Sequence, residues 1–159
     1  MSKFQLVAQK MWVHFMCPIW SFIVNLCYWL CRPSGIKEAR EKKKIYLALP
    51  LEDVMKKFKW TEDKFKDWLP WVITIINKEL SDDCDGAAIL AKWWWKYNNK
   101  TSRLVFLYSA DGKYGHAVCV LNDNTCFVSN SQVLYLDNTD WRQDLLEAFN
   151  NKYAVIIEK

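Results

Sequence analysis

The chain is poor in residues that break regular structure, with four glycines and four prolines among 159 residues. This scarcity excludes a collagen-like or low-complexity chain. It has only two histidines, and no Cys-x-x-Cys pair or Cys/His group with zinc-ligand spacing occurs, so no metal site is expected. With 52% hydrophobic and 25% charged residues, most of the chain is expected to fold. Its length fits one domain, or one domain with an appendage.

Aromatic and sulfur-bearing side chains are abundant instead. Aromatic residues make up 16% of the chain and include ten tryptophans, more than a core of this size needs, which indicates a lipid interface or a lined groove. The positions of the six cysteines do not suggest disulfides: three lie in one apolar segment, two flank an expected hairpin turn, and one stands among acidic residues. Reduced thiols favour a cytosolic domain.

Residues 11–31 form a run without a formal charge, and about 20 such residues suffice to cross a bilayer as a helix. The polar residues near this run recur every three or four positions and so form one stripe on a helix; they are His14, Pro18, Ser21, Asn25, Tyr28 and Arg32. Such a stripe suits a membrane span that contacts a partner, or a helix lying at the interface. The alternative is a core helix of the soluble domain. Bulky residues at the end of the run argue against a cleaved signal peptide.

The charges flanking this run predict its partner and its orientation. Two lysines precede it, whereas six basic and two acidic residues stand in 32–44. This excess places the following domain on the cytoplasmic side, or binds the basic run to anionic headgroups without a crossing. Nucleic acid is not expected as a partner, because the rest of the chain is nearly neutral. The chain is divided into an apolar membrane-associated or docking helix (1–32), a basic linker that can become helical (33–50) and one domain (51–159).

Periodicity predicts helices in the first half of the domain and strands in the second. Apolar residues follow helical spacing in three segments, which are 51–59, 61–80 (kinked at Pro70) and 84–97. Segments rich in β-branched and aromatic residues are expected to be strands; they are 103–109, 114–121, 125–136 and 153–158. A short helix over 140–150 precedes the last strand. Helices followed by an antiparallel sheet define an α+β fold.

Two side chains of this fold are suited to nucleophilic chemistry. Cys84 opens the helix 84–97, where unsatisfied backbone N–H groups favour a thiolate, although the acidic neighbours of Cys84 oppose that effect. His116 lies on an expected neighbouring strand and can act as general base and acid. A polar side chain on the next strand can hold the imidazole in one tautomer. The backbone N–H of Cys84 is a candidate oxyanion donor.

The third polar side chain depends on the hairpin loop between the two strands after His116. A three-residue loop sets His116 directly opposite Asn130, because opposed residues share one face of a sheet. A two-residue loop places Ser129 and Ser131 on the His116 face instead. Asp137 is a reserve candidate, farther along the chain. The residues alone leave these alternatives open.

Three motifs in this order resemble transglutaminase-like cysteine peptidases of the papain-like superfamily, of the small bacterial or phage type. The Asp-Cys-Asp sequence around Cys84, followed by Ala-Ile-Leu, matches the start of the family's cysteine helix. The Gly-His-Ala-Val sequence around His116 closely matches its histidine strand. The third motif departs from the pattern: where the family usually has Asp, this chain has Ser129 followed by Asn130. The match spans about residues 68–131.

The resemblance implies a papain-like core in which Cys84 is the nucleophile and His116 the base, and it requires no metal or organic cofactor. Because papain-like enzymes also use Asn to orient the histidine, it favours Asn130 as third member, with Ser129 as the alternative. It implies a membrane-associated cysteine hydrolase acting on an amide bond of a protein or peptide. The alternatives are acyl transfer of the transglutaminase type, and a catalytically inactive structural or interaction protein such as a virion component.

Overall fold

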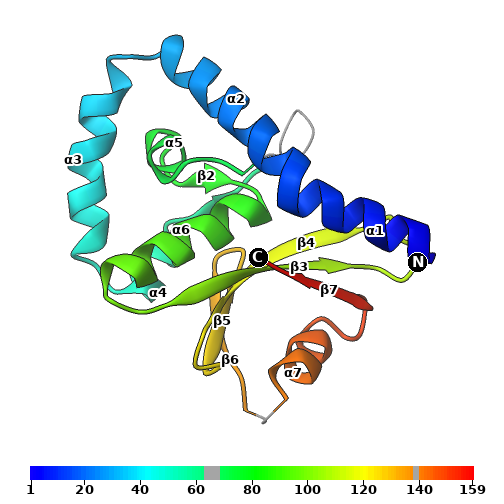
Figure 1. The fold of residues 1–159 in the computed structure, drawn as a ribbon. Helices are drawn as coiled ribbons and strands as arrows, with labels where there is room; N and C mark the ends of the chain where they lie inside the picture. The colour runs from blue at the N-terminus through cyan, green and yellow to red at the C-terminus, as the bar shows by residue number, and fades with distance from the viewer. Residues whose placement is uncertain (63–68, 138–139) are drawn as a thin grey trace.

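Helices come first and an antiparallel sheet second in the computed structural model of the chain, which describes residues 1–62, 69–137 and 140–159 (Figure 1). The α+β prediction is therefore confirmed. The main sheet has the strand order β6-β5-β4-β3-β7, and each neighbouring pair is antiparallel. Its strands are β3 (Ser102–Tyr108), β4 (Gly115–Leu121), β5 (Cys126–Ser129), β6 (Gln132–Tyr135) and β7 (Val155–Glu158). The predicted short helix is α7 (Trp141–Ala148), which precedes β7 as expected.

The prediction of one strand over 125–136 is wrong, because the chain turns back within it. Ser129 at the end of β5 pairs with Gln132 at the start of β6, so Asn130 and Ser131 form a two-residue turn. Asn130 has a φ of 49°, the left-handed conformation that tight hairpin turns need and that Asn tolerates better than most residues. The turn takes Asn130 out of the strand on which its expected role depends.

The hairpin between β4 and β5 has the shorter of the two loops considered. Val120 pairs with Phe127, a register that leaves two residues in the loop. This register sets Ser129 opposite Val118, and Val118 shares a face with His116 because residues two apart along a strand do so. Ser129 therefore lies on the same face of the sheet as His116. The expected pairing of His116 with Asn130 is wrong for this reason.

Helix α6 (Cys84–Tyr97) packs across one face of the sheet and confirms the helix predicted over 84–97 (Figure 1). Asp83 caps its N-terminus by accepting the Asp85 N–H at 3.0 Å. Small buried residues in its first turns let α6 approach β4 closely. At Gly86 a Cβ would lie only 2.4 Å from the Cβ of Asp82, so a side chain does not fit there. A second apolar cluster packs between the opposite face of the sheet and α7.

The helices between the N-terminal region and α6 are shorter than periodicity predicts. A short strand follows each of these two helices, and the two strands pair in parallel with each other. The spacing of apolar residues does not reveal this pairing. Pro70 precedes a helix rather than kinking one, since proline lacks the N–H that a helix interior needs. The rest of the predicted helix over 61–80 lies partly outside the described residues. The elements observed are α4 (Leu51–Lys56), β1 (Lys59–Trp60), α5 (Val72–Asn77) and β2 (Ser81–Asp82).

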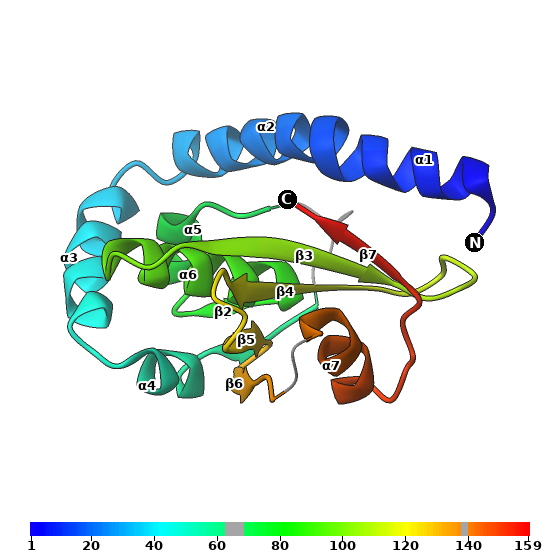
Figure 2. The same ribbon diagram turned by 60° about the horizontal axis from the view of Figure 1, so that its bottom comes forward.

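One long helical segment, Lys3–Leu30, runs along the outside of the molecule as a layer of its own (Figure 2). It comprises α1 (Lys3–Met11), a π-helical stretch η1 (Trp12–Met16) and α2 (Cys17–Leu30). The C-terminal strand lies near it, and Lys159 Nζ donates a hydrogen bond to the Val13 carbonyl in η1 at 3.0 Å. We call the whole segment Lys3–Leu30 the N-terminal helix.

The N-terminal helix turns polar side chains toward the domain. Ser21 Oγ accepts the Leu69 N–H at 2.7 Å. Asn25 Oδ1 accepts the Trp71 N–H at 2.7 Å, and Asn25 Nδ2 donates to the Leu69 carbonyl at 3.1 Å. Asn25 Oδ1 also accepts the Thr74 hydroxyl at 3.0 Å. The predicted polar stripe is thus a contact surface at Ser21 and Asn25, whereas His14, which belongs to the same predicted stripe, is exposed.

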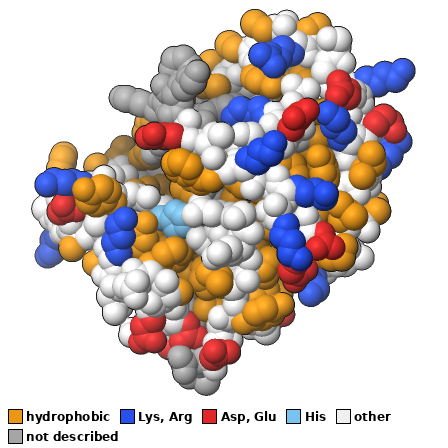
Figure 3. Space-filling model, turned by 180° about the vertical axis from the view of Figure 1, so that it is seen from behind, with side chains coloured by type: hydrophobic (Ala, Val, Ile, Leu, Met, Phe, Trp, Pro, Cys, Tyr) orange, Lys and Arg blue, Asp and Glu red, His pale blue; other side chains and the backbone are white. Residues whose placement is uncertain are grey.

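The segment predicted as a basic linker contains helix α3 (Gly35–Leu47), which packs against α5 and buries Ala39. Seen from behind, basic and acidic side chains stand close together over α3 (Figure 3). Lys42 pairs with Glu38 at 2.7 Å, and Lys44 pairs with Glu41 at 3.1 Å. Two of the five positive charges of this segment are therefore locally compensated.

Candidate functional site

Cys84 lies in the first turn of α6, against the beginning of β4. Its Sγ accepts a hydrogen bond from the Ala117 N–H at 3.4 Å. Ala117 directly follows His116, so the sulfur lies beside the strand residues that carry the imidazole. Because neighbouring strand residues point to opposite faces, the thiol comes from the α6 side of the sheet and the imidazole from the α7 side. Both side chains line one cavity of about 560 Å³.

The His116 imidazole is held by one hydroxyl and two aromatic rings. Its Nε2 lies 2.8 Å from Ser129 Oγ, within hydrogen-bonding distance. The Tyr153 ring stacks on it at a centroid distance of 6.0 Å and an angle of 12°, and the Phe149 ring packs edge-on at 5.1 Å. These contacts fix the plane of the imidazole. Phe149 and Tyr153 lie between α7 and β7, and motif comparison did not reveal them.

The surroundings of His116 disfavour its charged form. Burial, followed by the positive charge of Lys152, lowers the pKa of His116 from its ordinary value of 6.5 to about 4. Lys152 Nζ lies over the Tyr114 ring at 5.2 Å from its centroid and over the Tyr153 ring at 5.7 Å. The imidazole is therefore neutral near pH 7 and can accept a proton.

Asn130 lines the same cavity but does not take the hydrogen bond expected of it. That bond goes to Ser129, which the β4–β5 register brings to the His116 face. Asn130 Oδ1 is buried, and no donor among the described residues reaches it. An unsatisfied buried oxygen costs about 1–3 kcal/mol, so this atom is suited to accept a hydrogen bond from a ligand. Asp137, the reserve candidate, is exposed beyond β6.

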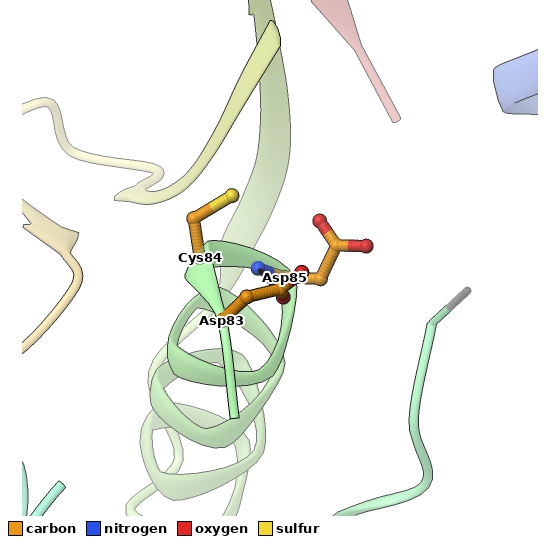
Figure 4. A group of neighbouring side chains, drawn as sticks. All are labelled: Asp83, Cys84 and Asp85. Atoms are coloured by element: carbon orange, nitrogen blue, oxygen red, sulfur yellow. Dashed lines mark hydrogen bonds between the residues drawn. The ribbon is translucent and has the colours of Figure 1, made fainter. Parts of the chain in front are cut away.

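Asp83, Cys84 and Asp85 bring two carboxylates and a thiol within 4.8 Å of one another. The Cys84 sulfur and the Asp85 carboxylate project beyond the first turn of α6, away from its body (Figure 4). These atoms are chemically able to hold a metal ion, but consecutive residues of one turn do not enclose a cation as a structural site does. Asp83 also caps the helix. The clearest effect of the two carboxylates is a negative field beside the sulfur, which opposes the helix N-terminus.

Aromatic rings and the N-terminal helix complete the cavity wall. The rings are Trp12, Trp60, Phe106, Tyr108, Tyr114 and Tyr153. Val13 and Cys17 of the N-terminal helix line the cavity together with Trp12, so a segment far from Cys84 in the sequence forms part of the site. The aromatic excess of the sequence indicated a lined groove, but the contribution of the N-terminal helix to that groove was not predicted.

Comparison of the chain with protein-family models, with curated proteins and with solved structures finds no match. The architecture is therefore described by its own elements, as helices followed by a five-stranded antiparallel sheet. The structure brings Cys84, His116, Asn130 and the hydroxyl of Ser129 to one region, and all six cysteines are free thiols. A thiol and a neutral, hydroxyl-bound imidazole that line one cavity are the two groups that nucleophilic acyl transfer by a cysteine uses.

Proposed function

We propose that the chain is a cysteine hydrolase with a papain-like core, a peptidase or amidase that cleaves an amide bond of a protein or peptide. One observation carries the proposal: Cys84, bonded to the Ala117 N–H, and His116, bonded to Ser129, line the same cavity. The order of helix, histidine strand and following strand supports it. Ser129 replaces Asn130 as the residue that orients the imidazole.

The proposed reaction uses both nitrogens of His116. With the Nε2 proton donated to Ser129 Oγ, we assign Nδ1 to take the thiol proton of Cys84 across the cavity that both side chains line, while the sulfur attacks the carbonyl carbon. The backbone N–H of Cys84 is the donor assigned to the oxyanion. The C–N bond then breaks, and the amine leaves with the proton from Nδ1. Water attacks the thioester, gives a proton to His116, and releases the acid and the thiol; an amine in place of water would give a new amide.

The electrostatics favour proton transfer during the attack over a resting ion pair. A pKa of about 4 keeps His116 neutral at pH 7, and the carboxylates of Asp83 and Asp85 disfavour an anionic sulfur. The Ala117 N–H has the opposite effect, because it donates to the sulfur. We assign His116 as a general base that acts as the sulfur–carbon bond forms.

Asn130 has a separate role in this proposal. Asn130 lines the cavity, and its buried Oδ1 has no donor among the described residues, so we assign this oxygen to accept a hydrogen bond from a substrate N–H. Asn130 then contributes to substrate binding, while Ser129 is a positioning residue for His116.

The first test compares thiol reactivity within one chain. Brief treatment with iodoacetamide, followed by peptide mass mapping, is expected to modify Cys84 at least about tenfold faster than the exposed Cys27 and Cys31, because His116 takes the thiol proton as the sulfur–carbon bond forms. His116→Gln should remove this advantage, whereas the matched control Cys31→Ala should preserve it. Hydrolysis of a fluorogenic peptide mixture should disappear in Cys84→Ala. Equal labelling of the three thiols, with no hydrolysis, would favour the non-catalytic interaction protein.

A further inference from the structure

The outer face of the N-terminal helix is the largest gathering of exposed apolar side chains on the described chain. Of 17 large hydrophobic side chains that are exposed there, 11 lie in Lys3–Leu30. They run the length of the helix, from Phe4, 82% exposed, to Leu30, 72% exposed, with Phe15 and Ile19 between them. Apolar surface of this extent on a soluble protein marks an interaction site.

The described chain leaves most of this face uncovered, although the Phe22 ring contacts Trp71 edge-on at a centroid distance of 6.0 Å. Only 28% of the most apolar window of the helix is buried, which is the reverse of a core helix. The side that does contact the domain bears Ser21 and Asn25, whose hydrogen bonds go to the segment 69–74. The helix is thus held by its polar side and presents its apolar side outward.

Charge complementarity identifies the partner. Residues 1–37 contain four basic residues, Lys3, Lys10, Arg32 and Lys37, and no acidic one. The remaining 18 basic residues equal the 18 acidic residues in number, so the whole net charge of +4 belongs to this segment. All four basic side chains are exposed. A positively charged helix with one apolar face is the form that binds anionic lipid surfaces.

The inward contacts favour a helix that lies on the bilayer over one that crosses it. A crossing would strip the Leu69 and Trp71 N–H groups of the Ser21 and Asn25 oxygens that accept them. It would also remove Val13 and Cys17 from the cavity wall. Neither cost arises if the helix stays docked and inserts only its outer face.

We propose that the N-terminal helix docks this protein peripherally on an anionic lipid bilayer, with the outer face at headgroup depth and the polar stripe still bonded to the domain. This inference does not depend on the chemistry of Cys84. Because the same helix lines the cavity, docking would hold the cavity close to the bilayer surface.

The test uses the full chain and vesicles of phosphatidylcholine with and without phosphatidylglycerol. Co-sedimentation is expected to be at least about tenfold tighter with the anionic lipid and to weaken with salt. The double variant Phe15→Glu/Ile19→Glu should lose at least about tenfold in affinity, because two inserted apolar side chains become charged. The matched control Tyr97→Glu/Tyr135→Glu places the same charges on exposed aromatic positions elsewhere and should bind as wild type does.

A second measurement separates docking from crossing and from self-association. An epitope placed before Met1 should remain accessible to added protease on protein-loaded vesicles; protection of the epitope would show that the helix crosses and would overturn the proposal. Failure of the wild type to sediment, or dimerisation abolished by Phe15→Glu/Ile19→Glu without lipid, would also overturn it. Cys84→Ala should bind vesicles normally, so loss of hydrolysis and loss of docking can be told apart.

Discussion

Two polar regions inside this molecule differ in how far their buried polar groups are hydrogen-bonded. Where the N-terminal helix meets the domain, the Asn25 amide is fully buried, and both its oxygen and its nitrogen have partners. In the cavity, the buried oxygen of Asn130 has no donor among the described residues, and the surroundings of His116 oppose its protonation. In the first region, which we call the helix–domain contact, the polar groups of Asn25 are hydrogen-bonded, whereas the second region keeps polar groups available for a ligand.

The difference separates stability from chemistry. A buried polar group that is fully bonded holds two elements in one arrangement, and removing it leaves its partners unpaired. A buried polar group without partners lowers stability, and its presence is explained if a substrate supplies the missing bond. Substitutions in the two regions should therefore have contrasting effects.

The largest loss of stability is expected from a substitution at the helix–domain contact. Asn25→Leu leaves the Trp71 N–H, the Thr74 hydroxyl and the Leu69 carbonyl without this partner, and should lower the free energy of unfolding by about 4 kcal/mol. Urea unfolding followed by tryptophan fluorescence measures this change. The control Leu26→Asn adds the same amide to the exposed face and should change stability by less than about 0.5 kcal/mol. A stabilised Asn25→Leu variant would contradict the role of these bonds.

The second largest loss of stability is expected when the pH is lowered, because the unfolded chain binds a proton at His116 more readily than the folded one. Its folded-state pKa of about 4 lies below the unfolded value of 6.5, so the unfolded chain binds a proton first as pH falls. The contribution of His116 to stability is fully present above pH 6.5 and is lost toward pH 4, by up to about 3 kcal/mol. Unfolding at pH 7 and pH 4 should show this loss in the wild type and a smaller one in His116→Gln. An equal loss in both proteins would place the acid sensitivity elsewhere.

Ser129 and Asn130 should differ in which kinetic constant they control. Ser129→Ala is expected to lower kcat about tenfold, because the imidazole loses the hydroxyl that orients it. Asn130→Gly, which suits the left-handed turn, should raise KM by a similar factor without lowering stability, because it removes the unsatisfied buried oxygen. Peptide hydrolysis by the two variants tests this split. The reverse pattern would restore Asn130 as the orienting residue.

The smallest effect is expected from Lys152. Burial is the larger cause of the low pKa of His116, and the charge of Lys152 is the second. Lys152→Gln should therefore raise that pKa by less than about one unit. Proton NMR titration can follow it, with His14→Gln used to assign the two histidine signals. An unchanged or lower pKa would show that Lys152 does not act on the imidazole through its charge.

Much of the second half of the fold was predictable from local sequence. Helix α6 follows an apolar pattern over fourteen residues. Strands β3, β4 and β7 follow apolar patterns over seven residues or fewer, and turn residues separate them. Cys84 and His116 could be selected because a motif marks each of them. Their presence in one cavity agrees with the motif order, and their catalytic roles stay predictions.

The rest depended on contacts that local patterns do not contain. The choice between Ser129 and Asn130 turned on one residue of loop length, because a shift of one residue exchanges the faces of a strand. The Ser-Asn-Ser sequence at 129–131 is a turn signal that the apolar residues on both sides obscured. The polar stripe was visible from its spacing, but its direction depended on the N–H groups of Leu69 and Trp71, far away in the sequence.

The bond from Lys159 to Val13 joins two segments that lie 146 residues apart in the sequence. During translation, the first 30 residues emerge well before the segment 69–74 and longer still before Lys159. The nascent N-terminal helix therefore has no docking partner for Ser21 and Asn25 until about 40 further residues have been synthesised, by the order of positions in the sequence. The apolar outer face of the helix is exposed throughout that interval, so contact with a bilayer or a chaperone can precede completion of the domain.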